Sequence, residues 1–166
     1  MNGFARTVRA ALRLWVVCAL GVATGSQAQM PAPALSTSTI DGHEVALQDM
    51  RDKVVLVTFW ASTCTICLAE QTDLVQTYER YRSRGLEIVA VAMPYDRPDL
   101  IKLHLAKYPM PFQVVWDKDG QISRQFLGIL GTPTTFIVDK SGRLVSKTVG
   151  AIDFDKLRHF LDASLG

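Results

Sequence analysis

Apolar residues fall along the chain in two kinds of segment. Runs of consecutive apolar and β-branched residues predict strands, and the longest runs are typical of strands buried on both faces. Segments with apolar residues three or four positions apart predict amphipathic helices. The predicted strands are residues 53–61, 86–93, 112–117, 134–139 and 143–149. The predicted helices are residues 65–84, 96–107 and 153–165, with one or two further helical turns over residues 121–126.

Turn residues separate these segments and indicate how the strands connect. Asp41-Gly42 lies between two β-prone stretches of residues 36–47 and predicts a hairpin. A second hairpin turn is predicted at residues 140–142, between the last two strands. Two β-α units therefore come first, and a hairpin followed by a helix comes last. That order predicts an α/β sandwich, with a mixed sheet between helices on both faces.

The first 28 residues have the order of features found in a secretory signal peptide. Three arginines and no acidic residue precede an apolar run at residues 14–22, which is too short to span a membrane. Ser26-Gln27-Ala28 then offers small residues for cleavage. We therefore expect a periplasmic or otherwise exported protein, with an uncleaved membrane anchor as the alternative. Residues 29–36 are expected to be a linker that hangs off a domain spanning residues 37–166.

The charge of the chain argues against a nucleic-acid partner. The whole sequence has 18 basic and 16 acidic residues. Cleavage after Ala28 would remove three arginines and no acidic residue, which leaves 15 basic and 16 acidic residues. A nearly neutral domain lacks the basic surface that binds phosphate backbones.

Cys64 and Cys67 are the only cysteines outside the predicted signal peptide, which holds Cys18. A structural zinc site needs four ligands, and the three histidines are scattered, so neither a metal nor another cofactor is predicted. Covalent haem attachment needs a histidine directly after the second cysteine, where Leu68 stands. A structural disulfide across two residues closes almost no loop and stabilises a chain little. Thiol–disulfide exchange fits the pair best.

The position of the pair supports this interpretation, because a buried strand there gives way to a helix. Cys64 would lie at the helix N-terminus, where unpaired backbone N–H groups and the helix dipole favour a thiolate. A thiolate attacks a disulfide and forms a mixed disulfide. Cys67 lies one turn later on the same face and can resolve that intermediate. We therefore predict that Cys64 is the nucleophile and that Cys67 releases the substrate.

Three stretches of the sequence together resemble one protein family. They are VVLVTFWASTCTIC, GTPTTFIVDKSG and LQDMRDK. Through them the chain resembles the TlpA- and ResA-like family of exported thioredoxin-fold thiol-disulfide oxidoreductases, over about residues 35–165. The resemblance implies a thioredoxin fold with an added N-terminal β-hairpin and an insertion between the second and third core strands. It also implies that Pro133 forms a cis peptide bond beside the cysteines, which leaves the Thr132 backbone free to pair with an extended substrate peptide.

Two positions near the cysteines depart from the family pattern. Thr63 stands where the family usually has tryptophan, and Thr65-Ile66 stands where a proline-containing pair is common. With Thr63 there, the face that would meet a substrate lacks the aromatic ring of that tryptophan. Together with Trp60, which is expected to pack near the cysteines, Thr63 completes a predicted substrate-binding set that also contains Thr132 and Pro133.

Glu70 is the candidate base for the second cysteine. Ordinary thioredoxins place a buried acid six residues before the first cysteine, and here that position is Thr58, which cannot accept a proton from Cys67. Glu70 follows Cys67 by three residues, where the TlpA/ResA-like pattern has a glutamate, and both side chains share one helix face. The alternative is an ordinary solvated helix glutamate.

The resulting hypothesis is an exported thiol-disulfide oxidoreductase that reduces protein disulfides. The resemblance implies apocytochromes c or copper-site proteins as substrates and a membrane electron donor upstream, with membrane contact only through an uncleaved leader. The alternatives are a protein-disulfide oxidant, a thioredoxin-fold peroxidase, and a non-enzymatic copper- or haem-delivery module. The peroxidase is disfavoured because no proline lies between Lys53 and Cys64. The delivery module is disfavoured because histidines and methionines form no cluster in the sequence.

Overall fold

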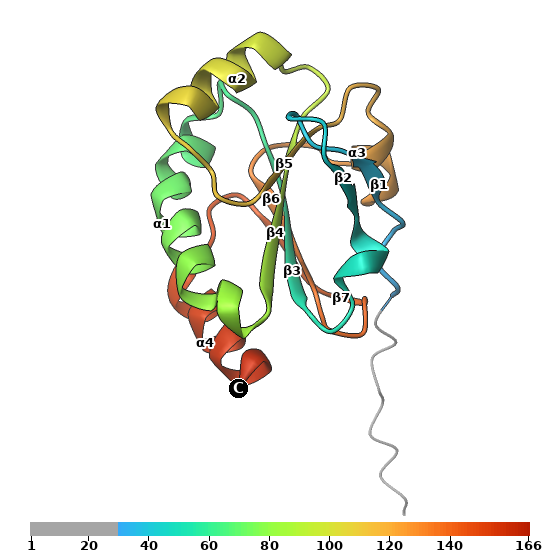
Figure 1. Ribbon diagram of the computed structural model, residues 1–166, viewed down its shortest axis with the longest axis vertical. Coiled ribbons are helices and arrows are strands. Elements are labelled where there is room, and N and C mark those ends of the chain that lie inside the picture. Colours follow the sequence, from blue (N-terminus) through green and yellow to red (C-terminus); the bar gives the residue numbers. More distant parts are fainter. Residues whose placement is uncertain (1–29) are drawn as a thin grey trace, which may run out of the picture.

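The computed structural model describes residues 30–166, so the predicted signal peptide lies outside the described residues. A five-stranded sheet forms the centre of the molecule (Figure 1). Its strand order is β5-β4-β3-β6-β7. Strands β3, β4 and β5 are parallel, whereas β6 is antiparallel to both β3 and β7. The strands are Val54–Trp60 (β3), Leu86–Ala92 (β4), Gln113–Trp116 (β5), Thr134–Val138 (β6) and Leu144–Val149 (β7). The sheet is mixed, as the order of the predicted elements requires.

Helices lie on both faces of this sheet (Figure 1). Helices α1 and α4 pack on one face through residues such as Leu74 and Leu161, and α2 adds Ile101 to the same core. Helix α3 covers the other face through Ile122, together with Val45 of the N-terminal segment. These three layers confirm the predicted α/β sandwich. The helices are α1 (Thr65–Tyr81), α2 (Pro98–Lys107), α3 (Gln121–Gln125) and α4 (Phe154–Leu165), with short 3-10 turns η1 (Leu47–Met50) and η2 (Arg82–Arg84).

Strand β3 shows why its sequence is an unbroken apolar run. All seven of its residues are buried. Leu56 and Trp60 contribute to the core beneath α1 and α4, whereas Val57 and Phe59 contribute to the core on the opposite face. A central strand covered on both faces needs apolar side chains on both. Its carboxyl end leads directly into the cysteine pair.

Local signals set the ends of the helices. The Asp153 side chain caps α4 by accepting the N–H of Lys156 at 3.1 Å. Gly85 ends η2 with a φ of 103°, a left-handed conformation that glycine adopts without steric cost. Helix α2 begins at Pro98 rather than at the predicted Asp96, because the fixed φ of proline suits the first helical turn. Asp96 therefore lies in the turn before the helix.

The predicted N-terminal hairpin is present. Strand β1 (Ser36–Ser38) pairs antiparallel with β2 (Glu44–Ala46) in a small separate sheet. The hairpin is attached to the edge of the main sheet, where the N–H of Ile40 donates to the carbonyl oxygen of Val114 at 2.8 Å. It thereby covers part of the free edge of β5.

The segment before the hairpin differs from the expectation of a pendant linker over residues 29–36. The N–H of Leu144 donates to the carbonyl oxygen of Met30 at 2.8 Å, and Leu35 is only 1 % exposed. The described part of this segment is therefore packed on the domain. The physical reason is that Leu35 supplies apolar surface to the core, while the preceding backbone pairs with the start of β7.

Three phenylalanines form the centre of the core opposite α1. The ring centroid of Phe126 lies 5.5 Å from that of Phe59 and 5.3 Å from that of Phe136. We expect Phe126→Ala to lower the free energy of unfolding by about 3–5 kcal/mol, because it leaves a cavity among buried rings. Denaturant unfolding monitored by circular dichroism measures this change. Leu130→Ala is the matched control, because Leu130 is fully exposed and its truncation should change stability by at most about 0.5 kcal/mol. Equal losses in the two variants would contradict the prediction.

Candidate active site

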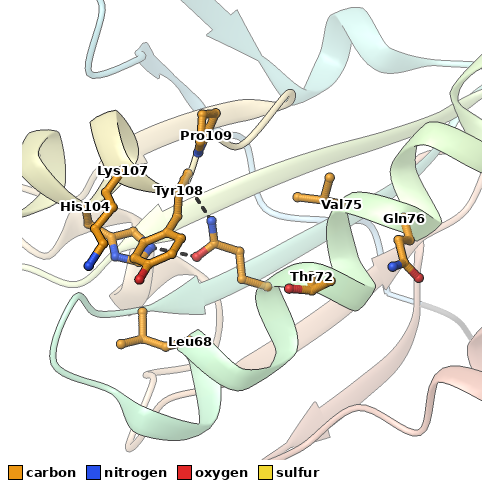
Figure 2. A pocket seen from close by; sticks show the side chains of 9 residues that line it. Leu68, Thr72, Val75, Gln76, His104, Lys107, Tyr108 and Pro109 are labelled. Carbon is orange, nitrogen blue, oxygen red and sulfur yellow. Dashed lines mark hydrogen bonds between the residues drawn. The ribbon is translucent and has the colours of Figure 1, made fainter.

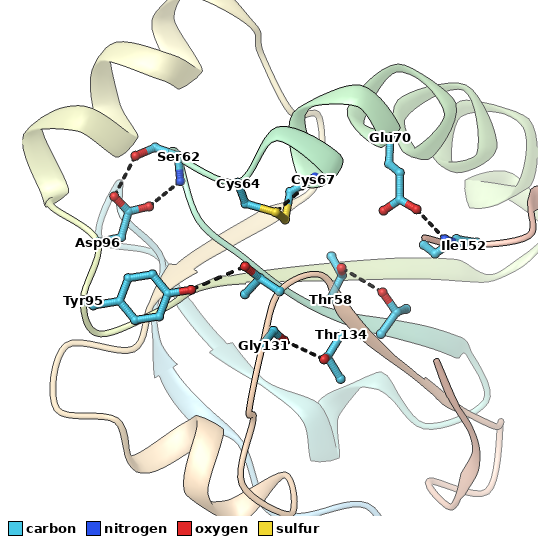
Figure 3. Close-up of a disulfide and its surroundings, with 12 residues drawn as sticks. Thr58, Ser62, Cys64, Cys67, Glu70, Tyr95, Asp96, Gly131, Thr134 and Ile152 are labelled. Carbon is cyan, nitrogen blue, oxygen red and sulfur yellow. Dashed lines mark hydrogen bonds between the residues drawn. A yellow bond between two sulfur atoms is a disulfide. The ribbon is translucent and has the colours of Figure 1, made fainter. Parts of the chain in front are cut away.

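The cysteine pair lies at the junction of β3 and α1. Cys64 and Cys67 form a disulfide, and their Cα atoms are 5.3 Å apart (Figure 3). Cys64 is the N-cap residue of α1, and its Sγ accepts the backbone N–H of Cys67 at 3.2 Å. The sulfur of Cys64 is thus placed where the first-turn amides and the helix dipole stabilise negative charge.

The two cysteines differ in exposure. Cys64 is half-buried, whereas Cys67 lies beneath the helix end and is 7 % exposed. In the reduced protein we expect iodoacetamide to alkylate Cys64 about tenfold faster than Cys67 or more, and at a lower pH than an ordinary thiol requires. Mass spectrometry of samples quenched over time measures both rates. The unfolded protein is the control, since both thiols should react alike there. Preferential labelling of Cys67 in the folded protein would reverse the predicted roles.

The segment before β6 lies beside the disulfide. The Thr132–Pro133 peptide bond is cis. Pro133 and Cys67 line the same small cavity, so residues far apart in the sequence meet here. Among the described residues the backbone of Thr132 makes no hydrogen bond, and its Oγ1 lies 3.4 Å from the hydroxyl of Tyr95. Thr132 therefore presents a free backbone N–H and a free carbonyl group next to the cysteines.

Glu70 is buried, not solvated. It is 7 % exposed, and its Oε1 accepts the backbone N–H of Ile152 from the segment before α4 (Figure 3). Burial raises the pKa of the Glu70 carboxyl, and the negative charge of Asp73 raises it further, while the hydrogen bond from Ile152 opposes the shift. The placement of Glu70 excludes an ordinary surface glutamate and puts a titratable carboxyl on the face of α1 that carries Cys67.

A small cavity connects these groups. Its volume is about 10 Å³, and Cys67, Glu70, Trp60 and Pro133 are among the residues that line it. This is roughly the space that one water molecule needs. The cavity is therefore too small for a substrate side chain, and it borders both Cys67 and Glu70.

The remaining predicted site residues have different places. Thr58 is buried, and its Oγ1 lies 2.9 Å from that of Thr135 on β6, so it offers no acid beneath Cys67. Thr63 is exposed beside the disulfide, where a substrate can touch it. Trp60, predicted to bind substrate, is only 3 % exposed and belongs to the core. Trp60 does pack near the cysteines, since it lines the same small cavity as Cys67, and its contact with substrate stays a prediction.

An open groove of about 650 Å³ runs along α1 and the end of α2 (Figure 2). Gln71 ties the two helices together there, because its side-chain amide donates to the carbonyl oxygen of Tyr108 at 2.8 Å and its Oε1 lies 2.6 Å from Nε2 of His104. The His104 ring also packs against Trp60, with centroids 5.5 Å apart, and burial lowers the pKa of His104. Leu68, which directly follows Cys67 in the sequence, also lines this groove.

Ser62 and Asp96 form a contact that the sequence did not indicate. The Asp96 carboxylate accepts both the backbone N–H of Ser62, at 2.6 Å, and its Oγ–H, at 2.7 Å. The available signal was topological, because the two residues follow the carboxyl ends of the neighbouring parallel strands β3 and β4, which meet at one edge of the sheet. Among residues 30–166 no group of three or more His, Cys, Asp or Glu side chains is placed to hold a metal ion.

Comparison with known proteins places this site in a family. The model of the AhpC/TSA family matches residues 28–147. The chain belongs to the AhpC/TSA family. Within this family the chain is 29 % identical over 131 residues to the thiol-disulfide oxidoreductase ResA of Bacillus thuringiensis subsp. konkukian, covering 78 % of this chain and 74 % of the relative.

Solved structures of thiol:disulfide interchange proteins agree with this assignment. A thiol:disulfide interchange protein of the thioredoxin family from Chlorobium tepidum superposes with a TM-score of 0.76 at 27 % identity, covering 83 % of this chain and 97 % of the other. A Chlorobium tepidum protein described as thiol:disulfide interchange protein DsbE gives a TM-score of 0.75 at 32 % identity with the same coverage. The protein is therefore a thiol-disulfide oxidoreductase of the ResA/DsbE type, which confirms the predicted fold, family resemblance and enzyme class.

Proposed function

We propose that this protein is an exported reductase of protein disulfides. The observation that carries the proposal is the placement of the two sulfurs, with Cys64 half-buried at the N-terminus of α1 and Cys67 buried behind it. Such a pair attacks with one thiol and resolves with the other. The relatives named thiol-disulfide oxidoreductase ResA support this chemistry.

The reaction balances as a two-electron exchange. The Cys64 thiolate attacks one sulfur of the substrate disulfide, and the other substrate sulfur leaves and takes up a proton. The Cys67 thiolate then attacks Cys64 in the mixed disulfide, which releases the second substrate thiol. The substrate disulfide is reduced to two thiols, while Cys64 and Cys67 are oxidised to their disulfide. A dithiol donor upstream, held in the membrane, would return two electrons and two protons to the pair.

A protein substrate would bind through its backbone. The free N–H and carbonyl group of Thr132 can add an extended peptide beside Cys64, as in β-strand addition. Exposed Thr63 directly precedes Cys64 and leaves room where an aromatic ring would otherwise narrow the site. Backbone pairing makes little demand on substrate sequence, which suits unfolded proteins such as apocytochromes c or copper-site proteins before metal insertion.

Export would follow from the signal peptide predicted over residues 1–28. Between residues 30 and 166 no helix combines the length and apolar character needed to cross a membrane. A cleaved leader would release the domain into the periplasm, and an uncleaved leader would hold it at the membrane. Fractionation of the producing cells followed by N-terminal sequencing distinguishes the two forms, and full-length protein in the cytoplasm would contradict export.

The direction of exchange is tested by comparing two reactions of the purified protein. The reduced form should reduce the disulfides of a model protein rapidly, whereas the oxidised form should introduce disulfides into a reduced, unfolded protein slowly. A faster oxidase reaction would instead identify a protein-disulfide oxidant. Stoichiometric copper or zinc in the purified protein, without exchange activity, would identify a metal-delivery module.

A further inference from the structure

Asp96 holds the loop that leads into Cys64. Its carboxylate lies in the turn between β4 and α2 and accepts two hydrogen bonds from Ser62, at 2.6 and 2.7 Å (Figure 3). A third bond at 2.8 Å, from the backbone N–H of Arg97, fixes the carboxylate itself. Asp96 is 7 % exposed, so these bonds are largely shielded from water, where hydrogen bonds to a charged acceptor are strong.

The position of the Cys64 thiol depends on this loop. The turn is closed by a hydrogen bond from the N–H of Cys64 to the carbonyl oxygen of Ala61 at 3.0 Å, and Cys64 then caps α1. Within the described chain, the contact of Ser62 with Asp96 ties the turn to a separate part of the sheet edge. Asp96 is thus linked to Cys64 through two residues of one tight turn.

The same carboxylate places a negative charge on this side of the cysteine pair. The guanidinium of Arg97 is paired with Asp99 at 2.6 Å rather than with Asp96. Burial lowers the pKa of His104, which keeps that ring neutral near pH 7 despite the attraction of Asp96. Within residues 30–166 no salt bridge involves Asp96, so no paired cation cancels its charge. The other charged and titratable groups nearby, on the elements that meet at the pair, are Tyr95 and Arg97 in the turn, Asp99, Lys102, His104 and Lys107 on α2, and Glu70 and Asp73 on α1.

We propose that Asp96 is a positioning residue that fixes the Cys64 loop through Ser62 and, by its charge, keeps the Cys64–Cys67 pair strongly reducing. This inference rests on the proposed reductase function. The helix N-terminus stabilises a Cys64 thiolate, and a carboxylate behind the loop opposes that stabilisation. Because the disulfide carries no charge, a less stable thiolate favours the oxidised pair and makes the reduced pair the better electron donor.

Asp96→Asn tests the charge, because asparagine keeps an oxygen that can accept the N–H of Ser62. The pH profile of Cys64 alkylation should move about one unit toward lower pH, which is a tenfold gain in thiolate stability. At a pH where Cys64 is ionised in both proteins, that tenfold gain raises the reduction potential of the pair by about 30 mV. The potential is measured by equilibration with glutathione.

Two further variants separate charge from structure. Asp99→Asn removes the same charge from the same segment without a bond to Ser62, and it should leave the profile and the potential unchanged. Ser62→Ala keeps the Asp96 carboxylate and removes only the hydrogen bond from the Ser62 hydroxyl. It should shift the alkylation profile and the reduction potential by less than half as much as Asp96→Asn does. If Asp96→Asn does not fold, Asp96→Ser replaces it, since a hydroxyl can still accept from the Ser62 backbone.

The proposal is overturned if the Asp96→Asn protein has the same pH profile of Cys64 alkylation and the same reduction potential as the wild type. An equal shift in Asp99→Asn would overturn it too, because the effect would then be general to the charge of the segment. The glutathione measurement needs no protein substrate. A wild-type protein that equilibrates with glutathione but reduces no protein disulfide would therefore contradict the proposed function and leave the Asp96 result standing.

Discussion

Replacing Cys67 with alanine is expected to leave a protein that captures substrate disulfides and does not let them go. Cys64 keeps its place at the N-terminus of α1, so the first attack should proceed at close to the wild-type rate. Release needs the second thiol, so turnover of a protein disulfide should fall by about 10³-fold or more, the scale of loss when a nucleophile is removed. Non-reducing electrophoresis would show the mixed disulfides, and mass spectrometry would identify the proteins held on Cys64.

Two cysteine variants are matched controls for this trap. Cys64→Ala should lose turnover to a similar extent but capture nothing, because buried Cys67 is poorly placed to meet a substrate. Cys18→Ala should behave as the wild type, because Cys18 belongs to the predicted signal peptide. If Cys64→Ala captured substrate and Cys67→Ala did not, Cys67 would be the nucleophile and Cys64 the resolving thiol.

The sequence predicted the parts of the structure that depend on local pattern. The continuous apolar run over residues 53–61 predicted a strand covered on both faces, and β3 has that place. The change to helical spacing after Cys64 located the strand-to-helix junction, and the chain there has Cys64 as the N-cap of α1. The predicted roles of Cys64 and Cys67 rested on that junction, on the exclusion of metal and haem sites, and on the family resemblance.

The sequence did not predict features that depend on tertiary contact. Trp60 has the same apolar character whether it faces substrate or core, and its burial depends on tertiary contacts such as that with the His104 ring. Leu35 stands in a proline- and alanine-rich stretch typical of linkers, yet its buried side chain and the backbone hydrogen bonds of the stretch hold it on the domain. Asp96 looked like part of a helix, and its contact with Ser62 depends on which strands are neighbours. None of these outcomes has a local signal.

Glu70→Gln is expected to separate the two chemical steps. The amide keeps the shape of the carboxyl and an oxygen that can accept the Ile152 N–H, but it cannot take a proton. Capture of a substrate by Cys64 should be nearly unchanged, because Glu70 lies on the side of Cys67. Release by Cys67 should slow about tenfold near neutral pH, which is less than the 10²–10⁴-fold typical of a positioned general base because proximity already does part of the work.

The rate of release by Cys67 should depend on pH through the ionisation of Glu70. Glu70 acts as a base only when ionised, and burial raises its pKa, so the base form is lost at a higher pH than for an exposed glutamate as the solution is acidified. Wild-type release should therefore slow as pH falls through that raised pKa, and the Gln variant should lack this step. The difference between the proteins should shrink at high pH, where hydroxide deprotonates Cys67 without help.

Stopped-flow decay of a preformed mixed disulfide across a pH series measures this step directly. Glu79→Gln is the matched control, because Glu79 lies on the same helix but is exposed and paired with Arg82 at 3.0 Å. Its profile should follow the wild type, so a loss confined to Glu70→Gln is a property of the site and not of helix charge. Superimposable profiles for Glu70→Gln and wild type would leave Glu70 as a buried residue that holds Ile152 in place, and Cys67 would then lose its proton directly to solvent.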